Sequence, residues 1–123
     1  MTARVHAWLG RQAAGELVIS DWVTAEVSSA LALKLRTGAL DLPGRAAALA
    51  AFQRLAADSL AVVPVLTAHF RMASVFVDRH ELGLRAADAL HLAVCADLGA
   101  ALATLDVRLR AAALEFGVPT SEV

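Results

Sequence analysis

Short apolar segments alternate with longer segments of helical periodicity along the whole chain. The apolar segments are predicted strands at residues 16–19, 60–66 and 101–104, with a last edge segment that starts at Val118. The remaining segments are predicted helices: residues 2–14, a helix from Ser20 or Asp21 to Gly38, a helix from Pro43 to about Ala57, then 67–78, 85–98 and 107–116. Strands separated by helical crossovers form a parallel sheet that helices cover on both faces. We therefore expect a three-layer α/β/α sandwich with a short, mainly parallel sheet, in which ligands bind beyond the carboxyl ends of the strands.

The length and composition predict one soluble domain spanning residues 1–123. Hydrophobic residues make up 59% and charged residues 19% of the chain, against roughly 25% charged in an average domain. No apolar run approaches the roughly 20 residues that cross a bilayer, and the start of the chain lacks the apolar segment of a secretory signal. Cys95 is the only cysteine, which excludes a disulfide framework. Its apolar neighbours in the sequence predict that it is a small core residue. These features predict a cytoplasmic protein.

The charge pattern gives no sign of nucleic-acid binding and does not exclude it. The formal net charge is −1, so no overall basic field is present. Lys34 is the only lysine, and the other ten of the eleven basic residues are arginine. Arginine binds phosphate through two parallel hydrogen bonds, so a local group of arginines around an acidic centre is compatible with this charge pattern.

Three of the twelve acidic residues stand in apolar surroundings. Glu26 lies on the helix after the first predicted strand, where Ser29, Ala30 and Leu33 share its face. Asp88 lies near the start of a helix that is apolar almost all round, which predicts a buried helix. Asp106 follows a predicted buried strand, at the edge where open α/β sheets keep their sites.

A purely structural role is an alternative to a functional role at each of these positions. Glu26 suits a surface helix residue, and Asp88 and Asp106 suit helix caps. Converging buried carboxylates, in contrast, call for a cation that neutralises them, and hard oxygen ligands favour Mg²⁺ or Mn²⁺. His91 is close enough to Asp88 in sequence to touch such a site, although a hydrogen-bonded structural role suits it better. Asp97, at the end of the same helix, is expected to be exposed.

Several other functional classes lack their motifs. The chain has no metal set of the His-x-x-His or Cys-x-x-Cys type, no phosphate-loop or dinucleotide glycine motif, and no nucleophile elbow. A phosphoacceptor receiver domain has a similar sheet but needs a lysine after its last strand. Lys34 lies in an early helix, which argues against that class.

Three segments, in this order, resemble the PIN domain family. Residues 24–31 resemble the family's Glu-bearing helix after its second strand. Residues 88–93, Asp-Ala-Leu-His-Leu-Ala, resemble its Asp-Ala-x-His-x-Ala helix, and Thr104-Leu105-Asp106 resembles its strand ending in Thr-x-Asp. The resemblance covers roughly residues 4–123 and is closest to the VapC-like toxins of bacterial toxin–antitoxin pairs.

The resemblance implies a metal-dependent endoribonuclease in which Glu26, Asp88 and Asp106 hold one or two Mg²⁺ or Mn²⁺ ions. It also implies an RNA substrate, a cognate antitoxin protein as partner and a homodimer. The family opens with an aspartate-bearing strand that lies between the strands matched here by residues 16–19 and 101–104. This chain instead resembles the family from the following helix onward, so the first aspartate has no counterpart. An inactive PIN-like module that acts only through partner binding is the alternative reading.

Overall fold

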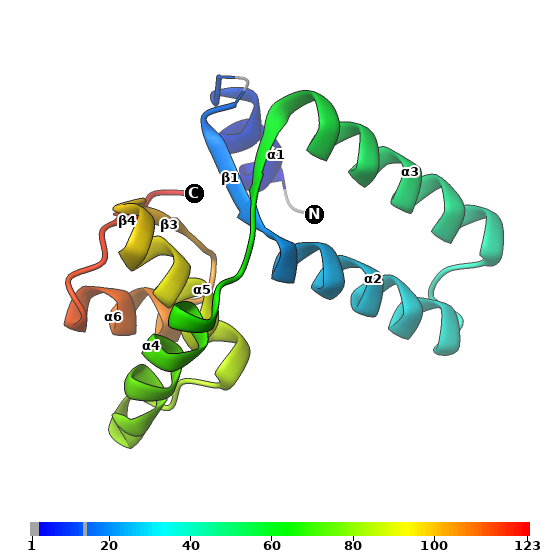
Figure 1. The fold of residues 1–123 in the computed structure, drawn as a ribbon. Coiled ribbons are helices and arrows are strands. Elements are labelled where there is room, and N and C mark those ends of the chain that lie inside the picture. Colours follow the sequence, from blue (N-terminus) through cyan, green and yellow to red (C-terminus); the bar gives the residue numbers. More distant parts are fainter. Residues whose placement is uncertain (1–2, 14) are drawn as a thin grey trace. The chain divides into compact units, whose positions relative to one another are not determined.

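The computed structural model describes residues 3–13 and 15–123. Figure 1 shows the order of elements, which follows the predicted order of helices and strands throughout. Their bounds are α1 Ala3–Gly10, β1 Leu17–Ser20, α2 Asp21–Arg36, α3 Leu42–Ser59, β2 Leu60–Val63, α4 Thr67–Asp78, a 3₁₀ turn His80–Leu82, α5 Ala86–Leu98, β3 Leu102–Ala103, α6 Val107–Glu115 and β4 Thr120–Ser121. The chain is thus a mixed α/β protein with short parallel strands, as predicted. No helix in the described ranges has the length and apolar character required to span a membrane.

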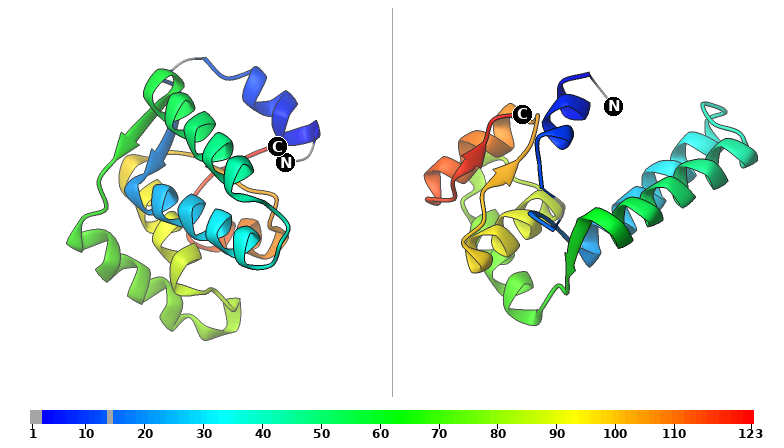
Figure 2. Two further views of the ribbon diagram at one scale, coloured as in Figure 1. Left: turned by 90° about the vertical axis from the view of Figure 1, so that its right-hand side faces the viewer. Right: turned by 90° about the horizontal axis from the view of Figure 1, so that it is seen from above.

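The chain divides into two compact units, Arg11–Pro64 and the pair of segments Met1–Gly10 and Val65–Val123. We call the first the hairpin unit and the second the core unit. The hairpin unit contains β1 and β2, paired in parallel from Leu17 opposite Leu60 to Ser20 opposite Val63. Helices α2 and α3 run in opposite directions and contact each other (Figure 1 and Figure 2). The Asp41 carboxylate caps α3 by accepting a hydrogen bond of 2.7 Å from the Gly44 N–H.

The second strand departs from the prediction in both length and burial. It ends at Val63 rather than at Leu66, because Pro64 has no N–H to continue the ladder. The strand was expected to be buried, yet the Val62 side chain is 45% exposed. No described apolar side chain of the hairpin unit is fully buried. Two strands and two helices therefore do not enclose a core of their own.

The core unit holds all of the buried apolar side chains found among the described residues. They come from α1, α4, α5, α6, β3 and the segment before β4: Trp8, Ala73, Phe76, Ala89, Leu90, Leu92, Ala93, Val94, Leu102, Leu109, Ala112, Ala113 and Val118. The short strands β3 and β4 pair in parallel, Leu102 opposite Thr120. At the ends of α4 and α6, the rings of Phe76 and Phe116 stack with centroids 4.2 Å apart. The hydrophobic free energy of this chain is thus concentrated in one unit.

Helix α5 is the centre of the core unit, as its sequence predicts. Ala89, Leu90, Leu92, Ala93 and Val94 are all buried, which is the pattern of a helix that is apolar all round. It ends at Gly99, whose φ of 65° is left-handed and is the conformation that glycine adopts most easily at a helix end. The predicted helix end at residue 98 is confirmed.

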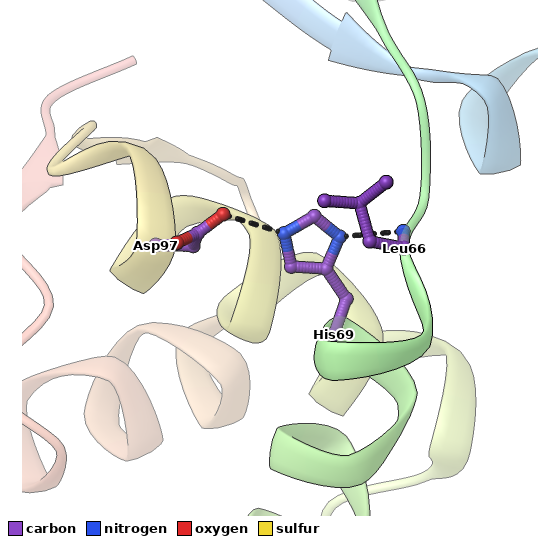
Figure 3. Close-up of polar contacts among 3 residues, drawn as sticks. All are labelled: Leu66, His69 and Asp97. Atoms are coloured by element: carbon purple, nitrogen blue, oxygen red, sulfur yellow. Dashed lines mark hydrogen bonds and ion pairs between the residues drawn. The ribbon is translucent and has the colours of Figure 1, made fainter.

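A buried histidine joins α4 to α5, a contact that the sequence did not predict. The His69 side chain is 5% exposed, and its Nε2 lies 2.8 Å from Oδ2 of Asp97 (Figure 3). Its Nδ1 accepts a hydrogen bond of 2.9 Å from the Leu66 N–H. Because Nδ1 accepts, the proton must be on Nε2, which donates to Asp97. Asp97 is exposed as predicted, at 58% of its side chain, but it also anchors the end of α5 to the start of α4.

Replacing His69 with alanine should lower the free energy of unfolding by about 2–4 kcal/mol, because ring packing and both hydrogen bonds are lost. Urea unfolding followed by circular dichroism would measure the change. His80→Ala is the matched control, since the His80 side chain is 93% exposed and its loss should change stability by no more than about 0.5 kcal/mol. Equal stability of the two variants would show that the His69 link contributes nothing.

Candidate functional site

Asp106 occupies the N-terminal cap of α6. Its Oδ1 accepts hydrogen bonds from the Arg108 N–H at 2.9 Å and from the Leu109 N–H at 3.2 Å. The predicted capping role is therefore confirmed. The cap engages only Oδ1, so the second oxygen of this exposed carboxylate remains available to a ligand. The same hydrogen bonds fix the direction in which the carboxylate points.

The turn that carries Asp106 is braced on both sides. The Asp106 N–H donates to the Thr104 hydroxyl at 3.0 Å. The Arg110 guanidinium donates to the Thr104 carbonyl at 2.8 Å. Thr104 thus acts as a scaffold for the aspartate two residues later, and the Thr-x-Asp spacing gives this motif a structural reason. The preceding strand is only Leu102–Ala103, in which Leu102 is buried and Ala103 is exposed, so the predicted strand is shorter and only half enclosed.

Asp88 lies in the first turn of α5, three residues after the capping residue Arg85. The residue is half-buried and directly precedes the buried pair Ala89 and Leu90. No described residue has a group within hydrogen-bond or ion-pair distance of the Asp88 carboxylate. The positive end of the helix dipole favours the charged carboxylate. A partly dehydrated carboxylate of this kind gains much from a cation.

Glu26 lies on α2, in the hairpin unit, whereas Asp88 and Asp106 belong to the core unit. Glu26 is half-buried, but the apolar surroundings that the sequence predicts for it are only partly present in the structure. Ser29 and Ala30 are exposed, and Leu33 is 53% exposed. Helix α2 contains no fully buried residue, because the hairpin unit has too few elements to cover it. The apolar sequence around Glu26 therefore reflects helix propensity more than burial.

The donors at these positions suit a hard divalent cation, since carboxylate oxygens are the ligands that Mg²⁺ and Mn²⁺ prefer. Within residues 3–13 and 15–123, no group of three histidine, cysteine or carboxylate side chains is arranged to hold a metal ion. His91 is half-buried on α5. Cys95 is half-buried, and burial raises the pKa of its thiol, which keeps the thiol protonated and unreactive. The chemistry of this region thus rests on carboxylates.

A comparison with protein families matches residues 2–115 to the PIN domain. The match covers most of the chain and includes the helix starts that carry Asp88 and Asp106. The chain belongs to the PIN domain family. PIN domains are typically nucleases, and they generally use divalent metal ions. A comparison with curated proteins found no match.

Proposed function

We propose that this protein is a metal-dependent endoribonuclease, and that it acts in the cytoplasm as the toxin of a toxin–antitoxin pair. Glu26, Asp88 and Asp106 are its catalytic residues and the ligands of Mg²⁺ or Mn²⁺. The family match supports this assignment because residues 2–115 include all three motif segments. The observation that carries the proposal is Asp88, a half-buried carboxylate that no described side chain or backbone group satisfies.

The carboxylates have distinct tasks in this proposal. Asp88, in the first turn of a buried helix, provides a fixed negative charge. Asp106 provides its second oxygen, oriented by the hydrogen bonds of the first. A divalent ion held by these groups would supply Lewis-acid polarisation of a phosphodiester and would offset charge on the leaving oxygen. No covalent intermediate with the protein is needed. A single strand or loop of RNA suits this site because its backbone can bend toward the carboxylates.

We further propose that the hairpin and core units work as one PIN domain. The family match runs continuously through both units. Glu26 comes from one unit and the two aspartates from the other, and the family resemblance gives all three residues the same task. The family's first strand, with its aspartate, completes the domain in this proposal. Ala3–Gly10 does not supply that strand, since it forms helix α1.

The experiment that tests the proposed function is a cleavage assay on the purified protein. Fluorescently labelled single-stranded RNA is incubated with Mg²⁺, with Mn²⁺ or with EDTA, and the products are separated on a gel. Cleavage with either ion and none with EDTA is the expected result. A DNA strand of the same sequence serves as the control for RNA chemistry. Cleavage that persists in EDTA would exclude the metal mechanism.

An inactive module that acts only through partner binding is the second candidate. The resemblance to the family favours this candidate, since the family's first aspartate is matched by no residue within 1–123. Calorimetric titration with Mn²⁺ separates the two candidates, because an inactive module has no need for a metal site. Saturable heat that disappears in an Asp88→Asn variant supports the enzyme, whereas absence of heat supports the module.

A homodimer and an antitoxin partner complete the proposal. Helix α4 exposes Phe70 at 52%, Met72 at 44% and Val75 at 60%. Met72 and Val75, three residues apart, share one face of the helix, and exposed apolar surface of this kind suits a protein interface. Light scattering should therefore report twice the mass of one chain. Val75→Glu should shift the protein toward monomer because a charge is costly in an apolar interface. Leu114→Glu, at an equally exposed position on α6, should leave the dimer intact. A monomer at every accessible concentration would contradict the dimer.

A further inference from the structure

The Arg108 side chain reaches from the start of α6 to the loop that leads into α5. Arg108 is the second residue of α6, and its N–H is held by the Asp106 carboxylate at 2.9 Å. A Cβ built on Gly83 would lie 3.7 Å from both Cδ and Nη1 of Arg108. Gly83 precedes α5 by three residues, and its φ of 66° is left-handed, so a larger residue here is strained. Glycine thus leaves an open backbone surface against which the arginine lies.

The guanidinium of Arg108 has no hydrogen-bond or ion-pair partner in the part of the chain that the structure describes. Among the described residues no carboxylate lies within ion-pair distance of it. Three other arginines of the core unit have partners: Arg79 pairs with Glu81, Arg110 binds the Thr104 carbonyl, and Arg4 binds the Val123 carbonyl. The Arg79 pairing also lowers the pKa of the Glu81 carboxyl. An exposed guanidinium that is fixed at its backbone and laid across a loop retains its full set of donors.

We propose that Arg108 binds a phosphate of the RNA backbone next to the proposed metal ligands. This inference rests on the proposed function. Asp106 lies two residues before Arg108, and the loop that it contacts enters the helix that carries Asp88. A polyanion approaching two carboxylates needs a positive group at the same place. Arginine suits this role because its planar fork matches a phosphate with two parallel hydrogen bonds.

Arg71 provides a matched control for the charge. It is exposed, and it lies two residues after His69 on α4. His69 contacts Asp97 at the far end of α5, so α4 and α5 run antiparallel. Asp88 and Asp97 are nine residues apart, or about 13 Å along the helix. Arg71 therefore has the same charge as Arg108 at the opposite end of this helix pair.

The test measures binding in EDTA, where cleavage does not interfere. Anisotropy of a fluorescent single-stranded RNA is titrated with wild type, Arg108→Gln, Arg108→Lys and Arg71→Gln over a series of salt concentrations. Arg108→Gln should weaken binding about tenfold and reduce the slope of log K against log salt by about 0.7, the loss of one phosphate contact. Arg108→Lys should keep the slope and weaken binding by less than Arg108→Gln. Arg71→Gln should match wild type.

Two outcomes would overturn the inference. Equal binding by Arg108→Gln and Arg71→Gln, with metal-dependent cleavage by wild type intact, would remove the role of Arg108 and leave the proposed function standing. Absence of both RNA binding and RNA cleavage by wild type would remove the inference together with that function. Circular dichroism of each variant confirms that the fold is retained.

Discussion

Replacing Asp88 with asparagine should reduce metal-dependent RNA cleavage by at least about 100-fold. Replacing a group that only hydrogen-bonds to a metal ligand costs about 10–100-fold, and the loss of a proposed ligand itself should cost more. The two side chains have nearly the same shape, so the fold should remain. Asp88 is half-buried without a hydrogen-bond partner among the described residues. Neutralising it therefore breaks no described contact and removes only the charge. Single-turnover cleavage at fixed Mn²⁺ concentration, with thermal unfolding alongside, would separate the effect on chemistry from any effect on stability.

Asp58→Asn is the control for this substitution. Asp58 is exposed near the end of α3, just before the amino end of β2. It lies at the opposite end of this strand from the carboxyl edge where α/β sheets hold their sites, so cleavage should be unchanged. Raising the Mn²⁺ concentration tests the assignment further, because a weakened metal site is partly restored by mass action. Full activity of Asp88→Asn at low Mn²⁺ would remove Asp88 from the metal site.

The order of the elements is predictable because the hydrophobic periodicity of this chain agrees with the residues that begin and end its helices. Helix α4 begins and ends at the predicted residues, Thr67 and Asp78. Gly99 ends α5, and Asp41 and Asp106 cap α3 and α6. These signals act within one helical turn, so neighbouring residues are sufficient to read them.

Contacts between distant segments were not predictable in the same way. The link from His69 to Asp97 joins residues 28 positions apart, and nothing near either residue marks the other. The burial of α2 and β2 was also overestimated, because their apolar residues were assigned to a core. The structure places its buried apolar side chains in the core unit. Local pattern gives periodicity, whereas burial depends on which elements pack against it.

The candidate site shows the same difference between local sequence signals and contacts of distant segments. The cap geometry of Asp106 and the buried helix of Asp88 follow from sequence signals close to each residue. No sequence signal near Arg108 marks its position over Gly83, because the two residues are 25 positions apart. The signal available in the sequence is the Asp-x-Arg spacing at the start of α6, which places the arginine about half a turn after the cap.

Adding an aspartate-bearing strand before α1 should stabilise the protein and strengthen metal binding. Strand β1 is hydrogen-bonded to β2 alone among the described residues, so its second edge is free. At the end of β1, the Ser20 hydroxyl and the Trp22 Nε1 are buried without a described partner. Buried polar groups without partners are costly. A strand paired with β1 offers backbone groups to this edge and brings polar groups close to Ser20.

The extended protein should gain roughly 2–4 kcal/mol from a few net hydrogen bonds, each worth about 1 kcal/mol. For a domain of this size that corresponds to a rise in Tm of roughly 10 °C. Its Mn²⁺ affinity should rise by about tenfold or more, since a further carboxylate oxygen joins a site for a hard cation. Differential scanning calorimetry and Mn²⁺ titration measure the two effects independently.

Two control extensions separate pairing from metal binding. The same strand with asparagine in place of the aspartate should keep the rise in Tm, because backbone pairing does not depend on that side chain. It should lose the gain in Mn²⁺ affinity. A glycine–serine extension of equal length should produce neither effect, since it remains a flexible coil. If all three extended proteins unfold at the same temperature as residues 1–123, the free edge of β1 does not accept a strand. The proposal that a strand completes this domain would then be wrong, and the inactive module would be the better account of the chain.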